Sequence, residues 1–449
     1  MSEKCPVIKN ESYQLRIDSL GSMGEGIGRM DGYAIFVDGA IPGDLCEIKV
    51  LKVKKNYAYA KLTGLLEASK DRIEPICKVA RQCGGCNLQH MNYEAQLHYK
   101  ENIIRNSLER IGGFPKEDID RVMEAIIGAA EPYYYRNKVQ YPVREEDGKL
   151  QIGFYAKHSH RIVESDTCYI QDPRNMEIVK SIRNFMIEFG IKGYNEEAHS
   201  GLLRHIVIRK STFTDRFHVI LVINGDKFPK VDKLKEILEK SGYVQNLSVN
   251  INKKRTNVIF DEELDHIAGE EKLVDNIKDL QFLISPQSFF QVNHEQTEKL
   301  YEKALEFAGL SGEETVFDLY CGIGTISLFL ARMAKEVHGV EIVEEAILDA
   351  NQNAEKNGIS NAHFYVGKAE EVVPTLYHEK EIRADVVVVD PPRKGCEESL
   401  LSTIVEMEAK KIVYVSCDPS TLARDLKYLA SKGYELQRVV GVDMFPMTV

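Results

Sequence analysis

The chain has 449 residues, which is long for one hydrophobic core and predicts two or three domains. Its 58 Lys and Arg residues against 69 Asp and Glu residues leave a formal net charge of −11, which argues weakly against nonspecific nucleic-acid binding, although local patches matter more than the total. No apolar run approaches the roughly 20 residues that span a bilayer, and residues 1–10 lack a signal-peptide core, so we expect a cytoplasmic protein with no membrane partner.

The segment from Tyr13 to Leu66 alternates apolar and polar residues in short runs separated by glycine-rich turns. This pattern predicts a small antiparallel barrel. Barrels of this size often bind single-stranded RNA on a basic face that carries aromatic rings. The candidate face consists of Lys52, Lys54, Lys55, Tyr57 and Tyr59. A solvated strand edge guarded by lysines explains the same pattern equally well.

Three cysteines form the motif C-x5-C-G-G-C at Cys77, Cys83 and Cys86. The two glycines permit a tight turn, so that three thiolates can converge on one metal centre. A fourth ligand is required, and Cys168 in S-D-T-C-Y is the best candidate by elimination. In a reducing compartment these cysteines are unlikely to be disulfides. Spacing alone leaves zinc and an iron–sulfur cluster open, although the x5 interval fits paired C-x2-C zinc knuckles less well.

An amphipathic helix is predicted from Tyr93 to Phe114, where it ends at Gly112-Gly113. Between Tyr133 and Phe260 strands return, with a helix from Pro229 to Ser241, which indicates an α+β middle domain. The predicted strands are K-V-Q-Y-P-V, Q-I-G-F-Y, H-I-V-I-R, H-V-I-L-V-I, N-L-S-V-N-I and N-V-I-F. Basic residues gather at Arg136, Lys138, Lys157, His158, His160 and Arg161, and Y-Y-Y-R-N-K at 133–138 places stacking rings beside cations.

From Thr297 onward helices and strands alternate, which predicts a mostly parallel sheet wound on both faces. The first strand, T-V-F-D-L-Y, runs into C-G-I-G-T, and the second ends at Glu341, where a carboxylate can meet ribose hydroxyls. Ser327 replaces the third glycine of a dinucleotide fingerprint, and Asp318 would repel a diphosphate. S-adenosylmethionine, which is cationic and lacks phosphates, therefore fits better than NAD.

Two later strands end in chemistry-bearing loops, D-P-P-R-K-G from Asp390 and S-C-D-P-S at Cys417. Amino-group methylases of this class tend to follow Pro-Pro with an aromatic residue, whereas here Arg393 follows. Carbon 5 of uracil is a poor nucleophile until a thiolate adds to carbon 6. Cysteine suits that role because it is both a good nucleophile and a competent leaving group. The alternative is a buried, inert thiol after a core strand.

These motifs together resemble the RNA 5-methyluridine methyltransferase family, in particular its ribosomal-RNA branch with a TRAM barrel and a 4Fe-4S cluster. G-E-G-I-G-R and A-I-P-G-D resemble the barrel, and C-x5-C-G-G-C with Cys168 resembles the cluster ligands. S-F-F-Q-V-N, D-L-Y-C-G-I-G-T, D-P-P-R-K-G and S-C-D-P-S-T-L-A-R-D-L resemble the catalytic domain. The resemblance covers nearly the whole chain.

The resemblance implies methylation of carbon 5 of a uridine in 23S ribosomal RNA, with Cys417 as the nucleophile. It implies that S-adenosylmethionine is held by Gln291, Tyr320, Glu341 and Asp390, and that a 4Fe-4S cluster is held by Cys77, Cys83, Cys86 and Cys168. The expected architecture is multidomain. It has a TRAM barrel, OB-like, at 5–67, an α+β iron–sulfur domain at 74–92 and 126–285, and a Rossmann-like α/β methyltransferase domain at 93–125 and 286–449. No obligate protein partner is evident.

The family pattern continues after D-M-F-P-M-T into an H-x-E motif, whose glutamate is the proton-abstracting base, and then into a last strand, whereas this sequence stops at Val449. From this we expect a truncated version or a damaged gene product that is poorly active, in which the strand ending near Val415 and a strand from Leu436 to Met444 keep unpaired edges and exposed apolar faces. Two alternatives stay open, a transfer-RNA uridine methyltransferase and an iron–sulfur RNA-binding protein without catalysis.

Overall fold

The computed structural model describes residues 5–449 and divides them into two compact units. The first unit comprises the described residues up to Ile103, Gly153–Tyr169 and Phe445–Val449, and the second comprises Ile104–Ile152 and Ile170–Met444. The cysteine segment therefore shares a unit with the N-terminal strands. The finer division into three domains stays a proposal.

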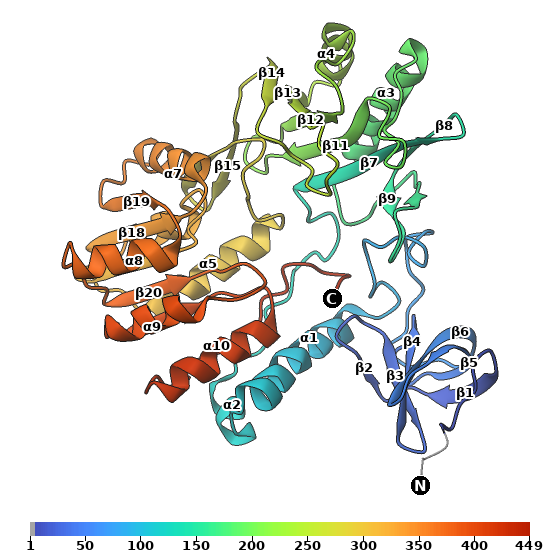
Figure 1. Cartoon of the computed structure of the whole chain (residues 1–449), viewed down its shortest axis with the longest axis horizontal. Coiled ribbons are helices and arrows are strands. Elements are labelled where there is room, and N and C mark those ends of the chain that lie inside the picture. Colours follow the sequence, from blue (N-terminus) through green and yellow to red (C-terminus); the bar gives the residue numbers. More distant parts are fainter. Residues whose placement is uncertain (1–4) are drawn as a thin grey trace. The chain divides into compact units, whose positions relative to one another are not determined.

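Among the described residues, the N-terminal strands form one strongly curved six-stranded sheet (Figure 1), in the order β1-β5-β6-β4-β3-β2. The strands are β1 (Ser12–Arg16), β2 (Ser19–Leu20), β3 (Gly26–Met30), β4 (Tyr33–Asp38), β5 (Leu45–Val53) and β6 (Tyr57–Glu67). Ile35, Val37 and Ile48 are buried in its core. Asp38, next to Val37, and Tyr59, between the buried Ala58 and Ala60, face outward. The barrel prediction is therefore confirmed.

One strand pair in the barrel differs from the prediction of a purely antiparallel sheet. β4 and β6 run parallel, with Phe36 opposite Tyr59 and Asp38 opposite Lys61. The reason is that β5 lies between them in the chain and runs antiparallel to β6, so the chain reverses direction twice between β4 and β6.

A buried ion pair fastens the segment after the barrel to the A-I-P-G-D turn. The Asp44 carboxylate accepts hydrogen bonds from the Ile41 and Ser69 N–H groups at 2.8 and 2.9 Å and pairs with Arg72 at 2.5 Å. Burial alone would raise the pKa of Asp44, but Arg72 and the two N–H groups outweigh it and lower that pKa. This aspartate thus links the barrel to the chain that leads into the cysteines.

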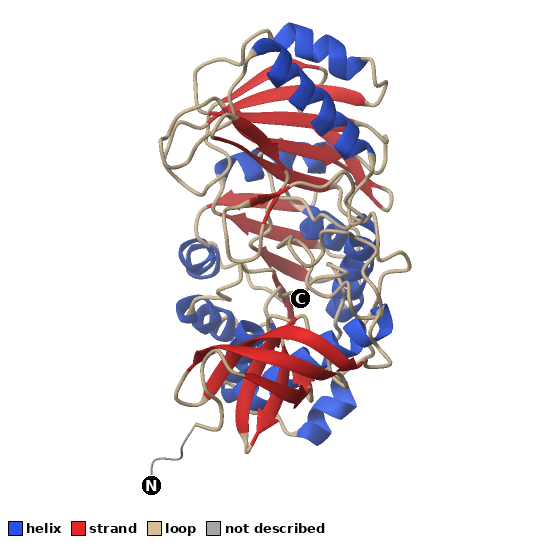
Figure 2. Ribbon diagram, turned by 90° about the vertical axis from the view of Figure 1, so that its right-hand side faces the viewer, coloured by secondary structure: helices blue, strands red, loops and turns tan. Residues whose placement is uncertain are grey.

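In the second unit, a six-stranded sheet has the order β14-β13-β12-β11-β7-β8. Helices α3 (Arg174–Phe189) and α4 (Val231–Glu239) lie across one face of it, as Figure 2 shows. The strands are β7 (Lys138–Glu146), β8 (Lys149–Ile152), β11 (Leu203–Lys210), β12 (Phe217–Ile223), β13 (Val244–Ile251) and β14 (Leu264–Ala268). The predicted strand Q-I-G-F-Y is broken at Gly153 into β8 and β9 (Phe154–Tyr155). At the break the chain passes so close to Val163 that a Cβ on Gly153 would lie 2.2 Å from the Val163 carbonyl oxygen, so only glycine fits there.

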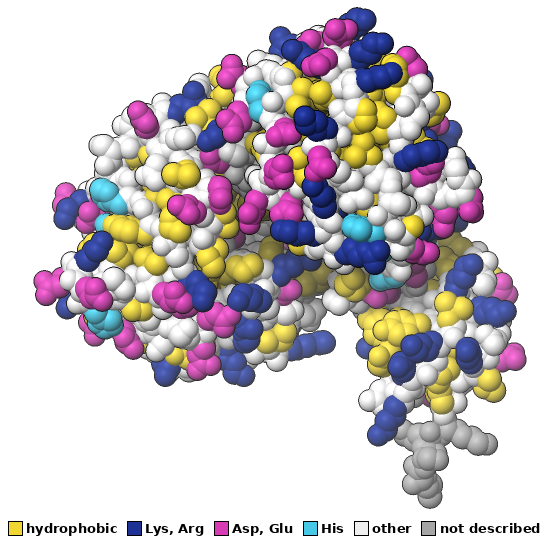
Figure 3. All heavy atoms as spheres, turned by 45° about the horizontal axis from the view of Figure 1, so that its top comes forward, with side chains coloured by type: hydrophobic (Ala, Val, Ile, Leu, Met, Phe, Trp, Pro, Cys, Tyr) yellow, Lys and Arg dark blue, Asp and Glu magenta, His cyan; other side chains and the backbone are white. Residues whose placement is uncertain are grey.

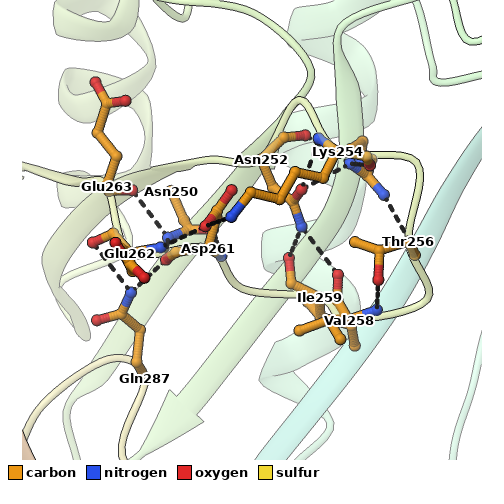
Figure 4. Close-up of polar contacts among 11 residues, drawn as sticks. Asn250, Asn252, Lys254, Thr256, Val258, Ile259, Asp261, Glu262, Glu263 and Gln287 are labelled. Carbon is orange, nitrogen blue, oxygen red and sulfur yellow. Dashed lines mark hydrogen bonds and ion pairs between the residues drawn. The ribbon is translucent and has the colours of Figure 1, made fainter.

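The predicted strand N-V-I-F at 257–260 is wrong, since these residues form a loop (Figure 4). The Asn252 amide donates to the carbonyls of Val258 and Ile259, both at 2.9 Å, so a side chain replaces the strand partner. Phe260 and Ile259 pack on the apolar side chains of β11 and β12. The loop therefore covers part of the sheet face opposite the helices.

The cofactor half contains a five-stranded parallel sheet in the order β19-β18-β17-β20-β21. The strands are β17 (Thr315–Leu319), β18 (Glu336–Glu341), β19 (Ala362–Val366), β20 (Val386–Val389) and β21 (Lys411–Tyr414). One apolar core joins one face of the sheet to α5 (His294–Ala308), α6 (Thr325–Ala331) and α7 (Glu344–Lys356). A second core joins the other face to α8 (Ala369–His378), α9 (Glu398–Glu406) and α10 (Pro419–Ser431). The doubly wound α/β fold is confirmed.

The strand order places a topological switch between β17 and β20, because the chain winds to one side through β18 and β19 and to the other through β20 and β21. Ligands of open α/β sheets bind outside the carboxyl ends of strands at such a switch. A separate hairpin, β15 (Leu273–Ile277) with β16 (Leu280–Ile284), packs on the α5 to α7 face.

The predicted helix at 93–114 is α-helical as α1 (Tyr93–Ser107) and continues as a π-helix, η1 (Leu108–Gly112), until Gly113 turns the chain at φ +74°. It is followed by α2 (Lys116–Val122). Among the helices of residues 5–449, none has both the length and the apolar character needed to cross a bilayer.

The predicted strand from Leu436 to Met444 is not formed as a regular strand. Val439 and Val442 make isolated bridges to Met123 and Ile127, and the buried Gln296 amide donates to the Ile127 and Asp443 carbonyls at 3.1 and 3.0 Å. The segment is thus bridged to the chain that follows α2, and Val439 is buried in a cluster with Leu108, Ile119 and Val122. β21 does form an edge of the described sheet, as expected.

Candidate active site

Four of the five residues predicted for cofactor binding and catalysis follow adjacent strands of the parallel sheet. Tyr320 follows β17, Glu341 ends β18, Asp390 follows β20 and Cys417 lies three residues after β21. The carboxyl ends of parallel strands meet at one edge of a sheet. The fifth residue, Gln291, lies on the segment that immediately precedes α5.

Glu341 closes the loop after β17. Its carboxylate accepts the Gly322 N–H at 3.2 Å and the Val343 N–H at 3.0 Å. The turn needs left-handed backbone at Tyr320, Gly322 and Gly324, with φ of +68°, +55° and +81°, which glycine adopts without steric cost. Beside Glu341 the apolar side chain of Ile342 is 58% exposed.

Asp318 supplies a buried carboxyl group beneath the same loop. The Ser327 hydroxyl donates to it at 2.5 Å, and its other oxygen has no hydrogen-bond partner among the described residues. Burial, together with the neighbouring Asp390 and Glu341, raises the pKa of Asp318 to about 7. Burial likewise raises the pKa of Asp390 to about 6. A group of carboxyls suits a cationic ligand such as a sulfonium and disfavours a diphosphate.

Cys417 is exposed and lies immediately before α10. Asp418 caps that helix by accepting the Ser420 and Thr421 N–H groups at 2.8 and 3.2 Å, and Pro419 occupies the first turn. Partial burial raises the pKa of the Cys417 thiol, Arg393 opposes this shift, and Asp390 adds to it. The thiol therefore lies within the electrostatic reach of both charged residues of the D-P-P-R turn, Asp390 and Arg393.

A buried carboxylate that the sequence reasoning missed joins this turn to α10. Asp425 accepts the Cys396 N–H at 2.9 Å and the Tyr414 hydroxyl at 2.6 Å. Arg424 donates to the Lys394 carbonyl at 2.9 Å. A Cβ on Gly395, whose φ is +78°, would lie 2.5 Å from an Asp425 oxygen. The only signal in the sequence is that Arg424-Asp425 lies one to two turns after a predicted helix start.

The segment that carries Gln291 is held by residues of the middle sheet. The Asn137 amide donates to the Gln291 carbonyl at 3.0 Å, and its N–H donates to the Val292 carbonyl at 2.8 Å. The buried Arg209 donates to the carbonyls of Pro286 and Ser288. Between these anchors Phe289 is 73% exposed. The Asn137 contact could not be foreseen, since its partner lies 154 residues away.

The four predicted metal ligands all belong to the first unit. Burial, with smaller contributions from the Cys168, Cys83 and Cys77 thiols, raises the pKa of Cys86 to about 12 against an opposing hydrogen bond with Gln89. The other three thiols therefore lie within electrostatic reach of Cys86. Among the described residues, however, no three His, Cys, Asp or Glu side chains have the geometry of a finished metal site. Thiols that are costly to ionise alone suit a cationic centre that stabilises thiolates.

The predicted RNA face is present on the barrel. Lys52, Lys54, Lys55 and Tyr59 are exposed, and Tyr57 is partly so. The Tyr59 ring lies 5.5 Å from that of Tyr57 and 5.7 Å from that of Phe36. The second predicted basic group is divided, with Arg136 and Lys138 in the second unit and 157–161 in the first.

Comparison with known proteins gives consistent matches over almost the whole chain. Residues 93–449 match the tRNA (uracil-5-)-methyltransferase family and residues 7–63 match the TRAM domain. Uncharacterized RNA methyltransferases of Halalkalibacterium halodurans and Clostridium acetobutylicum are 49% and 50% identical to the chain, over 99% and 100% of its length and 96% and 97% of theirs.

A solved structure extends this likeness to three dimensions. The tRNA (uracil-54, C5)-methyltransferase of Pyrococcus abyssi, in complex with S-adenosyl-L-homocysteine, is 28% identical with a TM-score of 0.77. The similarity covers 97% of this chain and 96% of that one.

Proposed function

The chain belongs to the tRNA (uracil-5-)-methyltransferase family and carries a TRAM domain, and from this premise we propose that it methylates carbon 5 of a uridine in 23S ribosomal RNA through a covalent adduct of Cys417. It is an S-adenosylmethionine-dependent enzyme that acts on RNA, so the alternative of a binding protein without catalysis is set aside. The observation that carries the proposal is an exposed thiol within reach of Arg393 and Asp390 at the strand ends.

The first step is activation of Cys417. Arg393 favours the thiolate, which adds to carbon 6 of the uracil while the electron pair of the 5,6 double bond moves towards oxygen 4. Carbon 5 thereby becomes nucleophilic. S-adenosylmethionine supplies the electrophilic methyl group that carbon 5 then takes. A base next removes the proton from carbon 5, the double bond re-forms, and Cys417 leaves as a thiolate.

We propose that S-adenosylmethionine is held by the residues predicted from the sequence. Glu341 would accept ribose hydroxyls, and the exposed Ile342 beside it offers an apolar surface for the adenine ring. Asp390 and Tyr320 would hold the amino-acid part, and Gln291 would reach it from the segment clamped by Asn137. The carboxyl group of Asp318 under the loop favours the positive sulfonium.

We also propose that Cys77, Cys83, Cys86 and Cys168 hold a 4Fe-4S cluster. The support is the electrostatic influence of the other three thiols on Cys86 within one unit and the resemblance of the motif. Zinc is the alternative that the ligand set allows, since tetrahedral thiolate sites bind either. Iron content and visible absorbance of the purified protein decide between them.

Transfer RNA is the second candidate substrate, because the Pyrococcus abyssi enzyme is named for it and aligns over 97% of this chain. The presence of the barrel therefore does not decide whether the substrate is ribosomal or transfer RNA. Transfer of labelled methyl groups to 23S ribosomal RNA and to bulk transfer RNA, measured in parallel, separates them. Label in transfer RNA alone would contradict the ribosomal assignment.

The covalent step has its own test. RNA with 5-fluorouridine at the target has no carbon 5 proton to lose, so the adduct accumulates. We expect a covalent protein–RNA adduct on denaturing gels. Methylation of the RNA in this adduct should require S-adenosylmethionine, and the adduct should be absent in Cys417→Ala. Its persistence in that variant would assign the nucleophile to another residue.

A further inference from the structure

We propose that the RNA-binding surface of the first unit continues from the barrel onto the turn at residues 156–161, here called the basic turn, and that the two form one track for single-stranded RNA. This inference rests on the proposed function, in which RNA is the substrate. It assigns the basic turn a role in holding RNA away from the reacting uridine.

The basic turn is a defined structure between β9 and β10 (Ile162–Val163). The Ala156 N–H donates to the Arg161 carbonyl at 2.8 Å, and the Ser159 N–H donates to the Ala156 carbonyl at 3.0 Å. The Ser159 hydroxyl accepts the Arg161 N–H at 3.0 Å. These hydrogen bonds fix the backbone of the turn, from which His158, Ser159, His160 and Arg161 are exposed.

The composition of the basic turn suits an anionic polymer. Its six residues are A-K-H-S-H-R, without a carboxylate, and the side chains of His158, His160 and Arg161 are exposed. The His160 ring stacks on Tyr155, with centroids 5.2 Å apart and planes inclined by 28°. Phosphates are bound by such donors, and unpaired bases stack on such rings.

One ion pair joins the basic turn to the aromatic face of the barrel. Lys157 Nζ lies 2.5 Å from the Asp38 carboxylate, and Asp38 is the last residue of β4. In the register of β4 with β6, Asp38 lies opposite Lys61 and Phe36 lies opposite Tyr59. The aromatic rings and the basic turn therefore lie at neighbouring positions on one unit.

The cysteine segment supports the basic turn from the other side. The Gly84 N–H donates to the Tyr155 carbonyl at 2.9 Å, and Cys83 bridges to Ala156. A Cβ on Gly84 would lie 3.0 Å from that carbonyl oxygen and 3.3 Å from the Lys157 nitrogen. The close approach explains why C-G-G-C has glycine at this position, and it couples the position of the turn to the cysteines.

Charge argues for a local track rather than general attraction. The protein has a formal net charge of −11, and on the face in Figure 3 Lys and Arg side chains alternate with Asp and Glu. The basic turn has no carboxylate of its own, and of its cations Lys157 pairs with Asp38 of the barrel, so that His158, His160 and Arg161 stand out against that background. Single-stranded RNA fits because its unpaired bases can stack, which duplex bases cannot.

The test measures binding of a fluorescent single-stranded RNA of about 12 nucleotides to the full chain by anisotropy, at several salt concentrations. We expect Tyr59→Ala and His160→Ala each to weaken binding about tenfold, the loss expected for one stacked base. Arg161→Ala should reduce the slope of log affinity against log salt by about 0.7, the value for one phosphate contact to a single strand. Arg110→Ala, an equal charge change on exposed η1, should bind as wild type.

A glycine pair tests the support from the cysteine segment. Gly84→Ala should weaken RNA binding about threefold to tenfold, since the added Cβ displaces the basic turn. Gly85→Ala is the matched control, because its Cβ meets the Cys83 sulfur only at 3.5 Å, an ordinary contact. Iron content and visible absorbance of both variants are measured alongside, so that loss of the cysteine site is seen directly.

The outcomes separate the two proposals. If wild type methylates RNA and Tyr59→Ala weakens binding, but His160→Ala and Arg161→Ala do not, the track ends at the barrel and the inference is overturned alone. If wild type transfers no methyl group to any RNA, the proposed function fails, whatever the turn variants do.

Discussion

The cysteines of the first unit and Cys417 of the second show two environments for one side chain. Cys86 has three other thiols for neighbours, and burial raises its pKa to about 12. Cys417 is exposed, and Arg393 works against the rise of its pKa. A thiolate needs a cation nearby to be stable. In the first unit a bound metal would have to provide it, whereas in the second the protein provides its own.

The largest effect expected from this contrast comes from removing Cys417. Cys417→Ala should lower methyl transfer by about 10⁴-fold or more, because carbon 5 of uracil is a poor nucleophile until a thiolate adds to carbon 6. RNA affinity should stay within about twofold of wild type, since the barrel face is unchanged. Single-turnover transfer of labelled methyl groups and anisotropy measure the two quantities, and methylation at a normal rate would refute the covalent mechanism.

Removing one thiol of the other group should act on structure rather than on chemistry. Cys86→Ser should abolish the visible absorbance and bound iron and destabilise the first unit, because structural metal sites supply folding free energy. In this variant the rate of Cys417 alkylation should stay within about twofold of the wild-type rate. Cys5→Ser, at an exposed cysteine, is the control, and an equal loss of iron there would show that the assignment of ligands is wrong.

Asp425→Asn tests the support of the reactive loop. The Cys396 N–H and the Tyr414 hydroxyl both donate to one oxygen of Asp425, Oδ2, whereas Arg424 Nε donates to the other oxygen, Oδ1, at 2.8 Å. An amide that keeps its oxygen towards the first two donors turns an NH2 group towards Arg424, so this charged hydrogen bond is lost at a cost of about 1–3 kcal/mol. We expect kcat to fall about tenfold with little change in KM for RNA. The control is Asp232→Asn, on the exposed start of α4, which should change neither kcat nor KM. A rise in KM of Asp425→Asn with unchanged kcat would argue against a positioning role.

The smallest effect concerns the pH dependence of Cys417. Its rate of alkylation should rise with pH through a pKa above the ordinary thiol value, because burial disfavours the thiolate. Arg393→Gln should move this profile to higher pH, since Arg393 lowers the pKa, and Asp390→Asn should move it to lower pH, since Asp390 raises it. Identical profiles for both variants would show that the thiol lies outside the reach of the turn.

The central strands β17 and β20 could be predicted because every residue in them is buried and they read as apolar runs, whereas β19 has no fully buried residue and was not predicted. V-V-V-V of β20 and the run that contains β21 are the clearest examples, and their ends located Asp390 and Cys417. The same reasoning failed at N-V-I-F, where an apolar run is held by the Asn252 amide instead of a strand. It also failed at 436–444, where the partner is the chain after α2.

Motifs and periodicity in the sequence alone determined the barrel, the doubly wound sheet and the residues at its strand ends, because these depend on near neighbours in the chain. Only the tertiary structure decided the links between distant residues. Asp425 with Cys396, Asn137 with Gln291, and Lys157 with Asp38 are separated by 29, 154 and 119 positions. Such contacts are selected by the packing of whole elements, for which no local pattern of residues carries a signal.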